Sequence, residues 1–185
     1  MRGTLSVSPL PCSGLTSPYH KRIFHFTNGG RQPFSGHAAN DQGDMHMRRI
    51  LFGFTAGFFA TLLFHQAAVF GLWQAHIAPF GAFNMHPTQP FGIPAVLSLA
   101  FWGGIWGILF AFIHKAFPAG GGYWLAAFLF GAIAPSLVAL IVVMPMKGLP
   151  MGGGWHAPLL LTAFLINGAW GVGTGLILRL TGAYK

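Results

Sequence analysis

Four apolar stretches constrain the fold of this 185-residue chain more than any other feature, because each is close to the roughly 20 residues that a helix needs to cross a bilayer. Connections rich in proline and glycine separate them, and such residues end one helix before the next begins. Only 6% of the residues are charged, against about 25% in an ordinary soluble domain. The sequence therefore predicts an all-α membrane protein, an antiparallel bundle of four transmembrane helices. The predicted spans are residues 50–73, 91–113, 123–143 and 158–180.

Residues 1–46 differ in composition from the rest of the chain. They are rich in Ser, Pro, Gly, Asn and basic residues, and they lack an apolar stretch long enough for a signal-peptide core. We predict a disordered tail over residues 1–46 and a membrane domain over residues 47–185. Because Met45-His46-Met47-Arg48-Arg49 leads directly into the first span, we expect the natural start at Met45 or Met47, with an upstream extension that is not part of the native protein.

The positions of Lys and Arg predict how the bundle is oriented, since these residues favour the cytoplasmic ends of spans. Arg48 and Arg49 precede the first span, Lys115 follows the second, and Arg179 closes the fourth. Lys147 alone lies in a connection on the opposite side. We predict that both termini are cytoplasmic. The formal net charge of +8 then reflects membrane topology, and no nucleic-acid partner is expected.

The spans repeat in pairs. The third aligns with the first at an offset of 78 residues, and the fourth aligns with the second at an offset of 64. This pattern favours a duplicated helical hairpin whose halves run in the same direction. Chance similarity among helices rich in Gly, Ala, Leu and Phe is the alternative. The second alignment matches Pro94 with Pro158, Leu97 with Leu161, Ser98 with Thr162, Gly104 with Gly168, Trp106 with Trp170 and Gly107 with Gly171.

Small residues recur at a spacing of four within the spans. This spacing lets the backbones of neighbouring helices approach closely in lipid. We expect these residues to pack helices within one chain, with a homodimer interface as the alternative. The glycines concerned are Gly53, Gly57, Gly103, Gly107, Gly171 and Gly175.

Polar side chains within the spans are costly to bury unless they are hydrogen-bonded. At about 1.5 Å per residue, these side chains share a depth of about 9 to 15 Å below the outer boundary. We predict a polar layer in the outer half of the bundle. It is either a ligand or ion site or a hydrogen-bonded contact that holds the helices in register. The layer consists of His65, Gln66, Ser98, Ser136 and Asn167.

Methionine and histidine gather in the two outer connections. Thioether and imidazole groups suit Cu(I) and are poor ligands for Mg²⁺ or Ca²⁺. The candidate ligands are His86, Met144, Met146 and His156, with interfacial packing as the alternative. A haem site ranks below copper, because it needs facing axial ligands and only His65 lies inside a span.

Both acidic residues, Asp41 and Asp44, precede the spans. Without later carboxylates, the chain cannot form paired-carboxylate hydrolase sites, carboxylate sites for hard cations, or proton relays built on buried acids. The single Cys12 excludes an intramolecular disulfide. No catalytic residue is predicted, and a non-enzymatic role is favoured.

From Met47 onward, the four spans and the opening Arg48-Arg49-Ile50-Leu51-Phe52-Gly53 resemble small four-span bacterial inner-membrane proteins of unknown function. The resemblance implies a bacterial inner membrane and supplies no catalytic residue. We expect the protein to bind or transport a small solute or ion through the polar layer. The alternatives are a structural or accessory subunit of a larger membrane complex, and a Cu(I)- or haem-binding protein. The expected partners are the lipid bilayer and either a second copy of the chain or a membrane complex.

Overall fold

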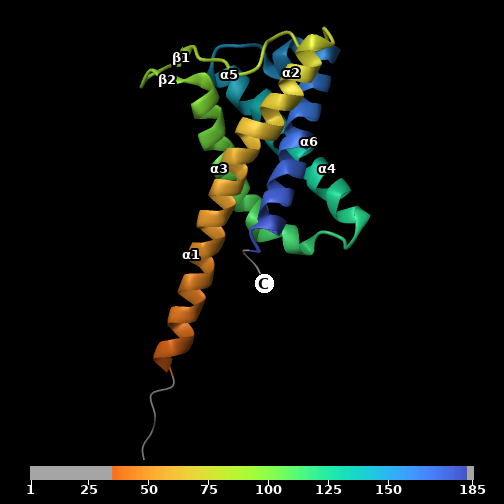
Figure 1. Cartoon of the computed structure of the whole chain (residues 1–185). Helices are drawn as coiled ribbons and strands as arrows, with labels where there is room; N and C mark the ends of the chain where they lie inside the picture. The colour runs from red at the N-terminus through yellow and green to blue at the C-terminus, as the bar shows by residue number, and fades with distance from the viewer. Residues whose placement is uncertain (1–34, 183–185) are drawn as a thin grey trace, which may run out of the picture. The chain divides into compact units, whose positions relative to one another are not determined.

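The computed structural model describes residues 35–182, which form a bundle of four long helices (Figure 1). Two of these helices contain a π-helical turn near the same end of the bundle. The first helix consists of α1 (Ser35–Ala60), the π-helical turn η1 (Thr61–His65) and α2 (Gln66–Gln74), and the second consists of α3 (Ala95–Ile113) and the 3-10 turn η2 (His114–Ala116). The third helix consists of α4 (Gly121–Val138), the π-helical turn η3 (Ala139–Val143) and α5 (Met144–Met146). The fourth helix is α6 (Ala157–Leu180).

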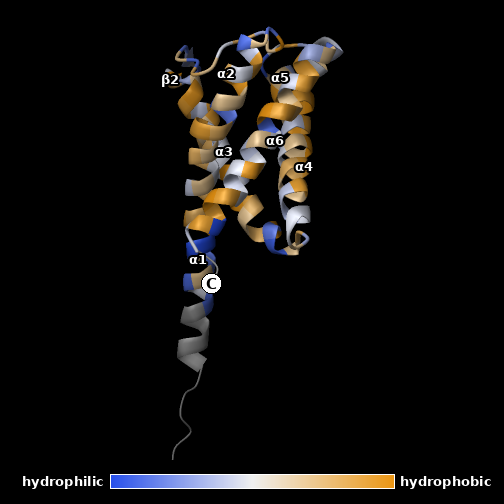
Figure 2. Cartoon of the chain, turned by 45° about the vertical axis from the view of Figure 1, so that its right-hand side comes forward, coloured by the Kyte–Doolittle hydropathy of each residue, from blue (hydrophilic) through white to orange (hydrophobic). Residues whose placement is uncertain are grey.

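All four helices are long and apolar enough to cross a membrane, over Gln42–Gln74, Ala95–Ala116, Gly121–Met146 and Ala157–Leu180. Figure 2 shows apolar residues along each of them and hydrophilic residues near the end where α6 finishes. We call this the basic end; it carries Arg48, Arg49, Lys115 and Arg179. The opposite, loop end carries the connections 75–94 and 147–156. The predicted all-α bundle of four antiparallel apolar helices is confirmed, and its lipid-facing surface implies a bilayer.

The helix boundaries differ from the predicted spans in two places. α1 begins at Ser35, so residues 35–46 are helical where composition predicts disorder; no proline lies in this stretch to prevent helix formation. The rest of the predicted tail, residues 1–34, lies outside the described residues. α3 begins at Ala95 and not at residue 91, because Gly92 has a φ of 67° and a short antiparallel pair joins β1 (Pro87–Thr88) to β2 (Ile93–Pro94).

Glycines bring α1 and α3 into backbone contact. A Cβ added at Gly57 would overlap the carbonyl oxygen of Gly103, and one added at Gly107 would overlap the carbonyl oxygen of Gly53. Lipid gives no hydrophobic drive for helix association, so such close approach supplies the attraction through dispersion contacts. These glycines therefore lie within the chain's own first hairpin.

The pair α4 and α6 packs in the same manner. A Cβ at Gly171 would overlap the carbonyl oxygen of Ala127, and one at Gly131 would overlap the carbonyl oxygen of Asn167. Gly175 faces the aromatic core, since its Cβ would lie 3.0 Å from the Tyr123 hydroxyl. α1 also packs along α6 and joins the two hairpins.

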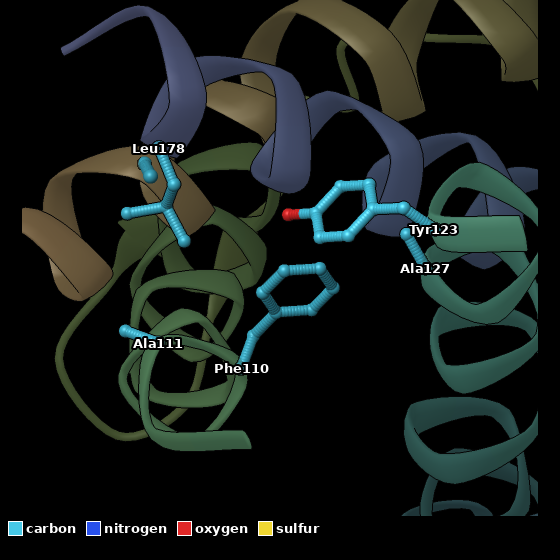
Figure 3. Close-up of a cluster of buried hydrophobic side chains, with 6 residues drawn as sticks. Phe110, Ala111, Tyr123, Ala127 and Leu178 are labelled. Atoms are coloured by element: carbon cyan, nitrogen blue, oxygen red, sulfur yellow. The ribbon is translucent and has the colours of Figure 1, made fainter. Parts of the chain in front are cut away.

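A cluster of buried side chains fills the bundle near the basic end. Figure 3 shows Tyr123 reaching inward from α4, with the ring of Phe110 beside it and Leu178 on α6 across from them. The Phe110 ring also meets Trp170 edge-on, at a centroid distance of 6.3 Å. This cluster joins α3, α4 and α6.

Candidate functional site

A buried histidine and glutamine sit side by side where η1 meets α2. His65 and Gln66 are 5% and 4% exposed, and Gln66 Nε2 lies 3.3 Å from His65 Nδ1. The backbone N–H of Phe83 donates to Gln66 Oε1 at 2.7 Å. Phe83 belongs to the connection 75–94, so this hydrogen bond ties the loop to a polar pair inside the bundle.

The same hydrogen bond favours one tautomer of His65. Because Gln66 Oε1 accepts from Phe83, the NH₂ group of the amide faces His65 and donates to Nδ1. A neutral imidazole that accepts at Nδ1 carries its proton on Nε2. No hydrogen bond from His65 Nε2 to another residue in 42–182 is present. In this tautomer the Nε2–H group is a donor for an additional oxygen acceptor.

The connection 75–94 is itself held by backbone hydrogen bonds to the start of α3. The N–H groups of Ala95 and Val96 donate to the carbonyls of His86 and Asn84 at 3.0 and 2.9 Å. These bonds satisfy two of the N–H groups that any helix leaves unpaired at its first turn. Residues 80–87 line an open cavity of about 530 Å³. The cavity is built on the loop that Gln66 holds.

A second polar pair links α4 to α6. Asn167 Nδ2 donates to Ser136 Oγ at 2.9 Å, and Ser136 Oγ donates to the carbonyl of Ala163 at 3.0 Å. Within residues 42–182, no hydrogen bond connects this pair to His65 or Gln66. Ser98 is half-buried on α3 and makes no side-chain hydrogen bond there. The five residues of the predicted layer thus fall into two bonded pairs and a separate serine.

The predicted copper ligands lie at the loop end. His86 and His156 are exposed, Met144 is half-buried, and Met146 is 81% exposed. Met144 lies near Gly153, where three successive glycines with positive φ form the turn before α6. Within the described part of the chain, no three His, Cys, Asp or Glu side chains are grouped closely enough to hold a metal ion. The copper and haem assignments stay predictions.

One contact between the hairpins was not expected from the sequence. The indole N–H of Trp170 donates to the carbonyl of Gly57 at 3.0 Å, and the hydroxyl of Thr61 donates to the same oxygen at 2.9 Å. A carbonyl has two lone pairs and can accept both bonds. The sequence repeat aligns Trp106 with Trp170, which is a signal that could have singled out this tryptophan. Its acceptor could not be predicted, because every residue has a backbone carbonyl.

No protein family, curated protein or solved structure matches this chain. A functional conclusion therefore depends on the geometry of these side chains.

A Gln66→Leu substitution is expected to release the loop. It removes the acceptor of the Phe83 N–H, and loss of a hydrogen bond of about 1 kcal/mol corresponds to about fivefold faster amide exchange in residues 80–87. Hydrogen exchange followed by mass spectrometry would measure the change. Gln74→Leu is the matched control, because Gln74 is exposed near the same end of the helix. Equal exchange in both variants would show that Gln66 does not hold the loop.

Proposed function

We propose that the protein is a non-enzymatic protein of a bacterial inner membrane that binds a small solute at its loop end. The hydrogen bond from Phe83 to Gln66 carries this proposal, because it ties the loop that lines the cavity to Gln66, the neighbour of the buried His65. The His65 N–H suits a solute that presents a carbonyl, carboxylate or phosphate oxygen. Binding at this position would be the first step of transport through the bundle.

Both termini are assigned to the cytoplasm in this proposal. Arg48, Arg49, Lys115 and Arg179 all lie at the basic end, whereas Lys147 lies at the loop end. This asymmetry supports a cytoplasmic basic end under the positive-inside rule. The solute would then approach from the outer face.

The bundle is proposed to have arisen by duplication of a hairpin. The ring of Phe54 on α1 lies where a Cβ of Gly104 on α3 would be, and the ring of Phe128 on α4 lies where a Cβ of Gly168 on α6 would be. The two glycines are 64 residues apart, which equals the sequence offset between these helices. The two phenylalanines are 74 residues apart, which is about one helical turn less than the sequence offset of 78 between α1 and α4. Matched contacts of this kind support a repeat more strongly than composition does.

A structural or accessory subunit is the second candidate. The Ser136 and Asn167 side chains satisfy one another across α4 and α6, as expected of a contact that only holds helices in register. In this case the exposed apolar surface would pack against a larger membrane complex, and chemical crosslinking in native membranes would capture a partner. Copper or haem binding stays as the third candidate.

Thermal unfolding of the purified full chain in nanodiscs would test the proposal. The probes are acetate, glycine and inorganic phosphate, with Cu(I) as a separate arm. We expect at least one oxygen-bearing probe to raise the midpoint of wild type and not of a His65→Phe variant. If no such probe stabilises wild type, or if His65→Phe responds equally, the solute site is wrong. Stabilisation by Cu(I) alone would favour the metal-binding candidate.

A further inference from the structure

An arginine at the end of α6 lies against two aromatic rings of α4. The guanidinium carbon of Arg179 is 3.7 Å from the ring centroid of Tyr123 and 5.1 Å from that of Trp124. The Tyr123 ring is itself fixed, because it is 3% exposed and lies in the core cluster of Figure 3. The Arg179 side chain is exposed. The α4 rings therefore hold a solvent-accessible guanidinium in one place.

A guanidinium that lies over an aromatic ring retains N–H donors for other partners. Its five N–H donors lie in the plane of the group, in a fork that matches two oxygens of a phosphate. A cation–π contact with a ring does not use all five donors, so N–H groups remain for an anion. Preorganisation of the fork lowers the entropy lost when an anion binds.

Other cations converge on the same end from different helices. Lys115 lies directly after α3, in η2, and Arg179 lies in the last turn of α6. Arg49 lies on α1, with its guanidinium carbon 6.0 Å from the Phe112 ring. Asp44 is the single carboxylate side chain within residues 42–182. Positive charge is therefore in excess at the basic end.

We propose that the basic end binds the phosphate headgroup of an anionic phospholipid, with the guanidinium of Arg179 as the central contact. A lipid fits better than a free phosphate, because Arg179 lies at the end of a candidate membrane span. Apolar surface continues from it along α4, where Leu125 and Leu129 are 62% and 45% exposed and can contact acyl chains. Clusters of Lys and Arg at the end of a membrane helix are suited to such headgroups. This site is separate from the solute site at the loop end.

Thermal unfolding of the delipidated full chain in detergent would test the lipid site. Phosphatidylglycerol is expected to raise the unfolding midpoint, whereas phosphatidylcholine, which has no net charge, and soluble glycerol 1-phosphate are not. Replacing Arg179 by glutamine should weaken the apparent affinity for phosphatidylglycerol about fivefold, since one cation near the headgroups contributes about that factor. Lys147→Gln, which removes a cation at the loop end, is the matched control and should bind as wild type does.

The shift for each variant is measured from its own lipid-free midpoint, so that a loss of intrinsic stability is not counted as a loss of binding. If Arg179→Gln does not fold, Lys115→Gln takes its place with the same expected factor. Equal stabilisation by phosphatidylglycerol and phosphatidylcholine would overturn the proposal, as would unchanged affinity in the Arg179 and Lys115 variants. If glycerol 1-phosphate stabilised the protein as much as phosphatidylglycerol does, the ligand would be a soluble phosphate ester and the lipid assignment would be overturned.

Discussion

A Gly57→Leu variant is expected to lose about 3 kcal/mol of folding free energy, the upper part of the usual range for overpacked cores. The cost is large because a Cβ at this position meets the backbone of Gly103 and Gly107, which cannot move aside as a flexible side chain would. α1 and α3 would have to separate along their whole contact. Unfolding by sodium dodecyl sulfate in mixed micelles, followed by circular dichroism, would measure the loss.

Gly71→Leu is the control for the Gly57 substitution. Gly71 is exposed on α2, and a Cβ there meets no atom within 4 Å. The expected change is within about 0.5 kcal/mol, as for most surface substitutions. A Gly57→Leu protein as stable as Gly71→Leu would show that α1 and α3 are not in backbone contact.

The four helices could be predicted because the bilayer leaves few choices. A segment in lipid must satisfy its backbone groups internally, so an apolar run of about 20 residues reads as a helix. Glycines at a spacing of four also predicted which faces approach closely. Gly57 and Gly107 lie in the backbone contact between α1 and α3.

The polar layer was harder to predict, because sequence gives depth along a helix but not the direction in which a side chain faces. His65 and Ser136 share a depth, yet His65 contacts its neighbour Gln66 and Ser136 is bonded to Ala163 on α6. The face that each helix turns toward the bundle interior depends on how the helix packs, and this packing depends on all four helices together. Depth alone therefore does not show which polar side chains are bonded to one another.

Backbone partners were not predictable at all. The N–H of Phe83 and the carbonyl of Gly57 take part in two of the contacts that connect distant segments. Every residue except proline carries both groups, so neither contact selects a residue type. The stacking of Arg179 on Tyr123 is similar, since sequence places both residues at one end but does not bring them together.

A Trp170→Phe variant is expected to lose about 2 kcal/mol. The Trp170 side chain is 2% exposed, and its indole donates to Gly57 on the other hairpin. Hydrogen bonds between membrane helices contribute about 0.6 kcal/mol on average and up to about 1.7. The smaller ring also leaves unfilled volume in a packed interior, which adds to the cost. The same unfolding titration in mixed micelles would measure the change.

Trp106→Phe provides the matched control, since Trp106 occupies the equivalent position in the sequence repeat. Its side chain is half-buried, and its indole makes no hydrogen bond within residues 42–182. Trp106 packs edge-on against Phe130 at 6.3 Å, a contact that phenylalanine can partly retain. The loss should therefore be smaller than for Trp170→Phe. Equal losses would mean that the bond to Gly57 adds nothing, and that packing alone joins the two hairpins.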